Sequence, residues 1–224
     1  MKKTVIFDMD GVIFDTENLI LQAWRELARQ YGYDESEMEK VFYSCIGTNA
    51  QVTKQLVLAH YGSDFPYETF RSASSDWFQQ SVRKNGMPVK EGARQLLAYL
   101  KKEGFVLGLA SSTRSLRVKE ELESAGLKEY FDVIIGGDMV EHSKPEPDVF
   151  LKCCEEMRIA PEQVYIIEDS FNGVRAARKA RATVIMVPDL IMPDEEMERI
   201  SDHIMPSLLQ VKEFFERRTE VDIT

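Results

Sequence analysis

Short apolar runs alternate with amphipathic stretches along most of this chain. The first run, Thr4–Phe7, is almost continuously apolar, as a strand buried on both faces is. Four more runs predict further strands, at residues 105–110, 131–135, 164–167 and 183–187. Because stretches with helical spacing separate the later strands, the pattern predicts an α/β fold with a doubly wound parallel sheet and helices on both of its faces.

The spacing of apolar residues changes between the first and the second predicted strand. Apolar residues recur there every three or four positions, and they predict four successive helices at residues 17–31, 35–45, 50–60 and 67–84. A simple crossover between parallel strands needs only about a dozen residues. We therefore expect residues 16–85 to form an inserted α-helical domain, and residues 1–15 and 86–224 to form the α/β core. The insert should lie over the carboxyl end of the first strand.

Composition and charge narrow the class of protein. The chain has 224 residues, of which 44% are hydrophobic and 29% charged, as in ordinary globular proteins. Its net charge of −10 argues against a nucleic-acid partner, which requires a basic face. No apolar run approaches the ~18 residues of a membrane span. The three cysteines lack metal-ligand spacing, so we expect a reducing, cytoplasmic location. We also expect a monomer that binds neither membrane nor nucleic acid.

Two acidic residues stand where the first strand should end. Asp8 and Asp10 follow the apolar run and precede Gly11. Side chains two positions apart in an extended chain point to the same side, so the carboxylates begin close together. Such neighbours raise each other's pKa unless a cation lies between them. We interpret the pair as a nucleophile and an acid/base group beside a hard metal ion; a turn or a helix N-cap is the alternative.

Polar residues also follow other strands of the predicted sheet. Ser111 and Ser112 follow the second strand, Glu168 and Asp169 end the fourth, and the loop before the fourth strand carries Lys144. Each of these signals alone is typical of a helix cap or a solvated side chain. Ligands of open parallel sheets bind beyond the carboxyl ends of the strands. The convergence of all these groups at one edge therefore predicts a catalytic site.

The residue types at this edge indicate phosphoryl transfer. Oxygen ligands without histidine or cysteine suit Mg²⁺, and the backbone carbonyl of Asp10 could add one more. Lys144, Ser111 and the amide of Ser112 would bind phosphoryl oxygens. A carboxylate nucleophile would become an aspartyl phosphate, while Asp10 would protonate the leaving oxygen and later accept a proton from water.

The sequence resembles the haloacid dehalogenase (HAD) superfamily over nearly its whole length. Four stretches of the chain resemble the four motifs of that superfamily: Asp8-Met9-Asp10-Gly11-Val12 the first, Ser111 the second, Lys144 in Ser-Lys-Pro-Glu-Pro-Asp the third, and Glu168-Asp169-Ser170 the fourth. The resemblance implies a Rossmann-like core with a helical cap domain, in the subgroup of β-phosphoglucomutases and small-molecule phosphatases. It implies Asp8 as the nucleophile and Asp10 as the acid/base. The implied Mg²⁺ ligands are Asp8, the carbonyl of Asp10 and Asp169, with Glu168 nearby.

Mutase and phosphatase remain alternatives within that subgroup. The resemblance implies that a mutase has a histidine where this chain has Ile20. It also implies an arginine, for the second phosphate, where this chain has Asn49, Ala50 and Gln51. Thr16, Trp24 and Gly47 agree with the mutase pattern. Because the phosphate clamp is missing, we expect a Mg²⁺-dependent phosphohydrolase of small organic phosphates such as sugar phosphates. The alternatives are a β-phosphoglucomutase-like isomerase and a non-enzymatic phospho-switch.

Overall fold

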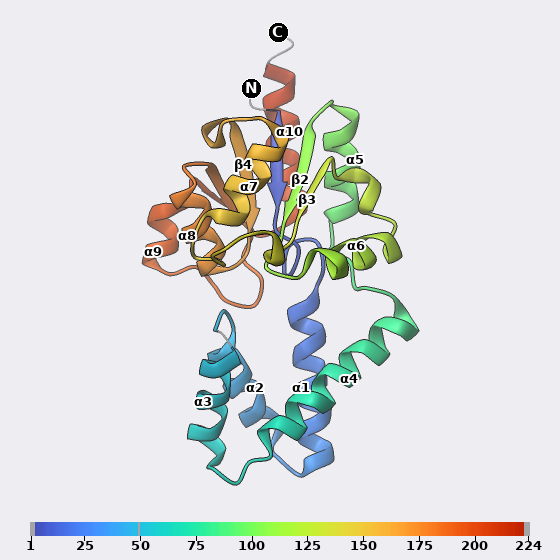
Figure 1. The fold of residues 1–224 in the computed structure, drawn as a ribbon, viewed down its shortest axis with the longest axis vertical. Coiled ribbons are helices and arrows are strands. Elements are labelled where there is room, and N and C mark those ends of the chain that lie inside the picture. The colour runs from blue at the N-terminus through green and yellow to red at the C-terminus, as the bar shows by residue number, and fades with distance from the viewer. Residues whose placement is uncertain (1–2, 49, 222–224) are drawn as a thin grey trace. The chain divides into compact units, whose positions relative to one another are not determined.

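The chain forms two compact units in the computed structural model, which describes residues 3–48 and 50–221 (Figure 1). One unit consists of Met1–Asp15 and Val89–Thr224, and the other of Thr16–Pro88. The first contains the sheet, and the second contains four helices. Their roles as catalytic core and cap domain stay a proposal.

The sheet of the larger unit has six strands, all paired in parallel, in the order β3-β2-β1-β4-β5-β6. The strands are β1 (Thr4–Phe7), β2 (Val106–Ala110), β3 (Val133–Ile135), β4 (Val164–Glu168), β5 (Thr183–Met186) and β6 (His203–Ile204). This arrangement confirms the predicted fold class. The sixth strand was not predicted, because a run of two residues carries no periodicity.

Helices follow the strands of this unit. They are α5 (Ala93–Lys102), α6 (Ser115–Ser124), α7 (Asp148–Met157), α8 (Phe171–Lys179), α9 (Glu195–Ile200) and α10 (Leu208–Val221). Three short 3₁₀ helices occupy Lys128–Tyr130, Gly137–Met139 and Pro161–Gln163. The six-residue α9 was not predicted. Within the described residues, no helix combines the length and the apolar character that a membrane span needs.

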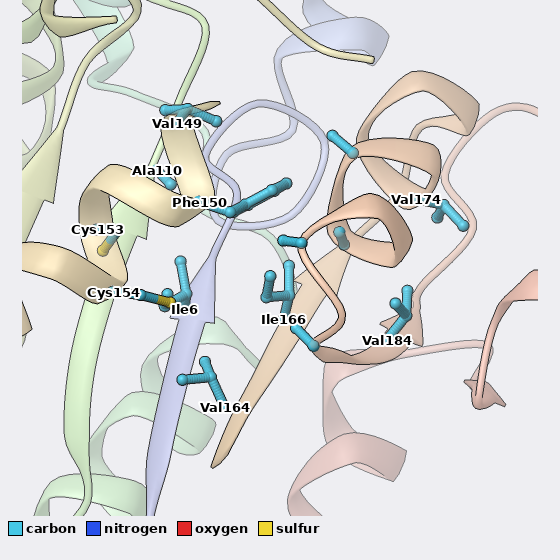
Figure 2. Packing of buried hydrophobic residues seen from close by; sticks show 14 of the residues in the cluster. Ile6, Ala110, Val149, Phe150, Cys153, Cys154, Val164, Ile166, Val174 and Val184 are labelled. Atoms are coloured by element: carbon cyan, nitrogen blue, oxygen red, sulfur yellow. The ribbon is translucent and has the colours of Figure 1, made fainter. Parts of the chain in front are cut away.

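A hydrophobic core joins one face of the sheet to α7 and α8 (Figure 2). Ile6, Ile166 and Val184 come from three neighbouring strands and are fully buried. Phe150 of α7 and Val174 of α8 belong to the same cluster. On the opposite face, α10 supplies aromatic side chains, and the ring centroids of Tyr165 and Phe215 lie 5.2 Å apart. Burial of the central strands on both faces explains their continuous apolar sequence.

The smaller unit is built from α1 (Thr16–Tyr31), α2 (Glu35–Cys45), α3 (Ala50–Tyr61) and α4 (Tyr67–Asn85). The side chain of Asp34 caps α2 by accepting a hydrogen bond from the backbone of Glu37. Trp24 is 8% exposed, and its ring makes edge contacts with Phe42 and Phe70 at centroid distances of 5.2 and 5.4 Å. Trp24 therefore belongs to the core of this unit.

Candidate active site

The carboxyl ends of three adjacent strands bring the predicted site residues together. In the sheet, β1 lies between β2 and β4, and Phe7 is in register with Leu109 and Ile167. The chain leaves all three strands at nearly the same level. The amide of Asp8 still donates to the carbonyl of Ile167 at 3.0 Å, which holds the first residue after β1 against β4. Parallel pairing thus places residues far apart in sequence at one edge.

Three carboxylates meet at this edge. Oxygen atoms of Asp8, Glu168 and Asp169 lie within 4.8 Å of one another. Asp8 is 7% exposed and Glu168 is fully buried. Such a group of buried acids is unstable unless cations or hydrogen-bond donors offset its charge.

Lys144 supplies one positive charge to this group. Its Nζ donates to Asp8 Oδ1 at 2.5 Å and to Glu168 Oε1 at 2.6 Å, and it contacts the carbonyl of Ala110 at 3.3 Å. The ammonium group also lies 4.8 Å from the centroid of the Phe150 ring. Because the side chain of Lys144 is only 7% exposed, these contacts replace its hydration. Lys144 is therefore part of the site.

The pKa values show how these groups act on one another. Burial, with help from the carboxylates of Glu168 and Asp10, raises the pKa of Asp8 from 3.8 to about 7, although Lys144 opposes the rise. Burial alone would lower the pKa of Lys144, but Asp8 and Glu168 outweigh it and raise that pKa. Burial also raises the pKa of Asp169, and the neighbouring carboxylates add to the effect. One lysine thus does not offset all the negative charge.

Glu168 uses its carboxylate within the protein. Its Oε1 accepts from Lys144, and its Oε2 accepts from the amides of Asp169 and Ser170 and from the hydroxyl of Ser170, each at 3.0 Å. The Ser170 hydroxyl in turn accepts from the amide of Gly173 and caps α8. Donors therefore already occupy about as many positions as a carboxylate offers.

Asp169 differs from Glu168 in its hydrogen bonding. Its Oδ1 has no hydrogen-bond partner among the residues that the structure describes. Gly11, with a φ of +82°, lies so close that a Cβ there would collide with the Asp169 carboxylate. The oxygen-only donor set and this free oxygen fit a hard divalent cation such as Mg²⁺. Asp8 and Asp169 are the side chains that would hold it.

Asp10 lies beside this group in a different environment. Its Oδ2 accepts a hydrogen bond of 3.1 Å from the hydroxyl of Thr113. Its carboxylate is not among the three clustered acids, and the role of its carbonyl as a metal ligand stays a prediction. The separate environment suits a group that handles protons rather than a cation.

The loop after β2 contributes the hydroxyls. Ser111 is fully buried, its Oγ accepts from the amide of Thr113 at 3.0 Å, and Ser112 is exposed. The contact between Thr113 and Asp10 was not predicted, because a threonine after two serines is typical of an ordinary helix start. The phosphate-binding roles of Ser111, Ser112 and Lys144 stay predictions.

The smaller unit carries the residues that bear on the choice between mutase and phosphatase. Ile20 lies in α1 and is partly buried. Ala50 and Gln51 are exposed at the start of α3, and Asn49 lies outside the described residues. The aliphatic side chain of Ile20 cannot donate or accept a proton as the histidine of a mutase could. The difference from the mutase pattern at this position stays a prediction.

Comparison with known proteins shows relatives along most of the chain. The family model for haloacid dehalogenase-like hydrolase matches residues 5–187. The phosphorylated carbohydrates phosphatase of Thermotoga maritima is 32% identical over 182 residues, which are 80% of this chain and 81% of that protein. Fructose-1-phosphate phosphatase YqaB of Escherichia coli is 32% identical over 182 residues, 79% of this chain and 91% of its own.

A solved structure agrees with these relatives. CbbY from Rhodobacter sphaeroides, in complex with phosphate, superposes with a TM-score of 0.68 and 28% identity, covering 93% of this chain and 95% of that one. The named phosphatases confirm the prediction of a phosphatase-type enzyme. The chain belongs to the haloacid dehalogenase-like hydrolase family, in its subgroup of β-phosphoglucomutases and phosphatases.

Proposed function

We propose that this protein is a Mg²⁺-dependent phosphohydrolase that removes phosphate from small phosphorylated carbohydrates through a phosphoenzyme on Asp8. The observation that carries the proposal is the group formed by Asp8, Asp169 and Lys144. Lys144 contacts the carboxylate of Asp8, and a carboxylate oxygen of Asp169 lies within 4.8 Å of one from Asp8. Asp169 Oδ1 is buried and has no hydrogen-bond partner among the described residues. A cation and a lysine beside one carboxylate prepare it to meet an anionic phosphoryl group.

The reaction has two steps. In the first, a carboxylate oxygen of Asp8 forms a bond to phosphorus, the bond from phosphorus to the sugar oxygen breaks, and Asp10 gives that oxygen a proton. In the second, Asp10 takes a proton from water as the water oxygen attacks phosphorus, which releases phosphate and restores Asp8. In both steps the ammonium group of Lys144 stabilises the negative charge of Asp8 and of the phosphoryl group. The chemistry that Mg²⁺ supplies when bound is neutralisation of charge on the phosphoryl oxygens.

The hydrogen bond from Thr113 supports the role of Asp10. It gives Oδ2 of Asp10 a neutral hydroxyl donor at 3.1 Å. A carboxylate that does not ligate the cation can exchange protons with the leaving oxygen and with water. Asp10 is therefore better suited to proton transfer than Asp8, which Lys144 contacts directly.

The relatives support a sugar phosphate as the substrate class. One acts by name on phosphorylated carbohydrates and another on fructose 1-phosphate. A mutase must return the phosphoryl group to the sugar before water attacks. Because Ile20 stands at the position of the mutase histidine, we favour hydrolysis over isomerisation.

A screen of sugar phosphates and nucleoside phosphates tests the proposal. Phosphate release should require Mg²⁺, stop with a chelator, and be lost in Asp8→Asn, with sugar phosphates as the best substrates. Formation of glucose 6-phosphate from β-glucose 1-phosphate without phosphate release would show a mutase instead. A phosphorylated Asp8 that persists without turnover of any substrate would show a phospho-switch.

A further inference from the structure

A second charged group lies in the larger unit, close to the clustered acids. Lys90 Nζ donates to Asp189 Oδ1 at 2.5 Å and lies 3.4 Å from Asp15 Oδ1. The side chain of Asp189 is 7% exposed and that of Lys90 is 20% exposed. This contact accounts for one oxygen of Asp189. The other, Oδ2, is buried and has no hydrogen-bond partner among the described residues.

The sheet brings Asp189 to the same edge as Asp169. Neighbouring strands β4 and β5 pair with Glu168 opposite Met186, and the amide of Val187 donates to the carbonyl of Glu168 at 2.7 Å. Asp169 directly follows β4, and Asp189 lies three residues after β5. The negative charge of Asp189 is close enough to act on the carboxylate of Asp169. Two buried carboxylate oxygens, which have no partner in the part of the chain that the structure describes, thus follow adjacent strands.

Structural roles explain only part of this arrangement. The ion pair with Lys90 uses Oδ1 alone, and the N-cap of the following helix is Asp194. A buried carboxylate oxygen without a donor costs free energy, so a donor or a cation is expected at that position. Mg²⁺ keeps several of its waters in protein sites, and groups outside its direct ligands orient those waters and tune its affinity.

We propose that Asp189 is a positioning residue of the cation site, whose free carboxylate oxygen accepts hydrogen bonds from the hydration shell of a divalent cation held by Asp8 and Asp169. Lys90 donates to the other oxygen and offsets part of the negative charge of the Asp189 carboxylate. The inference rests on the proposed function, because that function requires the cation. Asp189 lies outside the four stretches that resemble the superfamily motifs.

The test measures Mg²⁺ binding by isothermal titration calorimetry, without substrate. Asp189→Asn keeps the shape and an acceptor for Lys90 but removes the charge, and its Kd for Mg²⁺ should rise about tenfold. Glu198→Gln is the matched control, because it removes the same charge from an exposed position of α9. Its Kd should stay within about twofold of the wild type. An Asp189→Asn protein with the control's affinity would overturn the inference.

A second variant separates an electrostatic role from a structural one. Lys90→Gln removes the positive charge beside Asp189, so Mg²⁺ should bind more tightly than in the wild type, whereas Asp189→Asn binds it more weakly. A purely structural ion pair would weaken Mg²⁺ binding in both variants, and this result would overturn the inference. Mg²⁺ binding by the wild type tests the proposed function separately. If the wild type binds no Mg²⁺, the proposed function and the inference about Asp189 are both wrong. If it binds Mg²⁺ but the variants do not differ from it, only the inference is wrong.

Discussion

Hydrogen bonds give the three clustered carboxylates and the neighbouring Asp10 different partners. Several donors contact Glu168, Thr113 donates to Asp10, and Lys144 contacts Asp8. Asp169 Oδ1 has no hydrogen-bond partner in the described part of the chain. The residue type alone would not distinguish them. Because the three clustered acids outnumber the one ammonium group of Lys144, the site carries an excess of negative charge that a divalent cation would offset. Burial raises the pKa of two of these acids, Asp8 and Asp169.

The hydroxyl of Thr113 allows a direct test at a single residue. Thr113→Val keeps the shape of the side chain but removes the donor to Asp10, and we expect kcat to fall about tenfold, since a hydrogen bond to a charged group contributes about 1.5 kcal/mol. KM should change little, because the contact is to the acid/base group. Steady-state kinetics measure both constants. Thr113→Ser restores the donor and should recover most of the activity, and equal activity in the valine and serine variants would contradict the role.

The turn after β1 brings the backbone close to the carboxylate of Asp169, one of the proposed metal ligands. Gly11 lies against the Asp169 carboxylate at a φ of +82°, where side chains are strained and where a Cβ would also collide. Gly104 has a φ of +76° but open space around it. The two glycines therefore separate the cost of the left-handed conformation from the cost of the collision.

Alanine at these glycines should give two different results. Gly11→Ala and Gly104→Ala should each lose about 1 kcal/mol of stability from the left-handed conformation. Gly11→Ala alone should also weaken Mg²⁺ binding, because Asp169 must move. Chemical denaturation and Mg²⁺ titration measure the two effects. Equal Mg²⁺ affinity in both variants would show that the turn does not position Asp169.

The elements that could be predicted from the sequence are those with a strong periodicity. The apolar run of β1 and the amphipathic α1 have clear patterns, whereas β6 has two residues and α9 has six. The site residues that could be predicted follow strand ends as unusual acids. The contacts of Thr113 and Asp189 could not be predicted, because they join segments that lie up to 103 residues apart in the sequence.

The stability of the whole molecule should depend on the cation and on pH together. The pKa of Asp8 is 3.8 in its ordinary state and about 7 in the fold without a cation. The folded chain therefore binds this proton more tightly than the unfolded chain, and Asp8 lowers the stability as pH rises from about 4 to about 7. A cation must displace the proton, so its affinity falls as pH drops below that pKa.

Melting temperatures measured with and without Mg²⁺ test this linkage. The rise that Mg²⁺ produces should be larger at about pH 8 than at about pH 6, and below the pKa the affinity should fall by about tenfold per pH unit for one displaced proton. Asp8→Asn has no such proton to lose, so its weaker Mg²⁺ response should depend much less on pH. A wild-type response that is the same at both values would contradict the linkage.

Asp8 is the nucleophile of the proposed reaction, and mass spectrometry of the phosphoenzyme tests this role directly. Asp10→Asn should form the phosphoenzyme slowly and hydrolyse it more slowly still, because no group then activates water. The Asp10→Asn protein is incubated with Mg²⁺ and a sugar phosphate that the wild type hydrolyses, and the reaction is quenched with acid. This protein should then carry one phosphoryl group, on the peptide that contains Asp8. The double variant Asp8→Asn/Asp10→Asn should carry none. A phosphoryl group on any other residue, or Mg²⁺-dependent turnover by Asp8→Asn, would contradict the account.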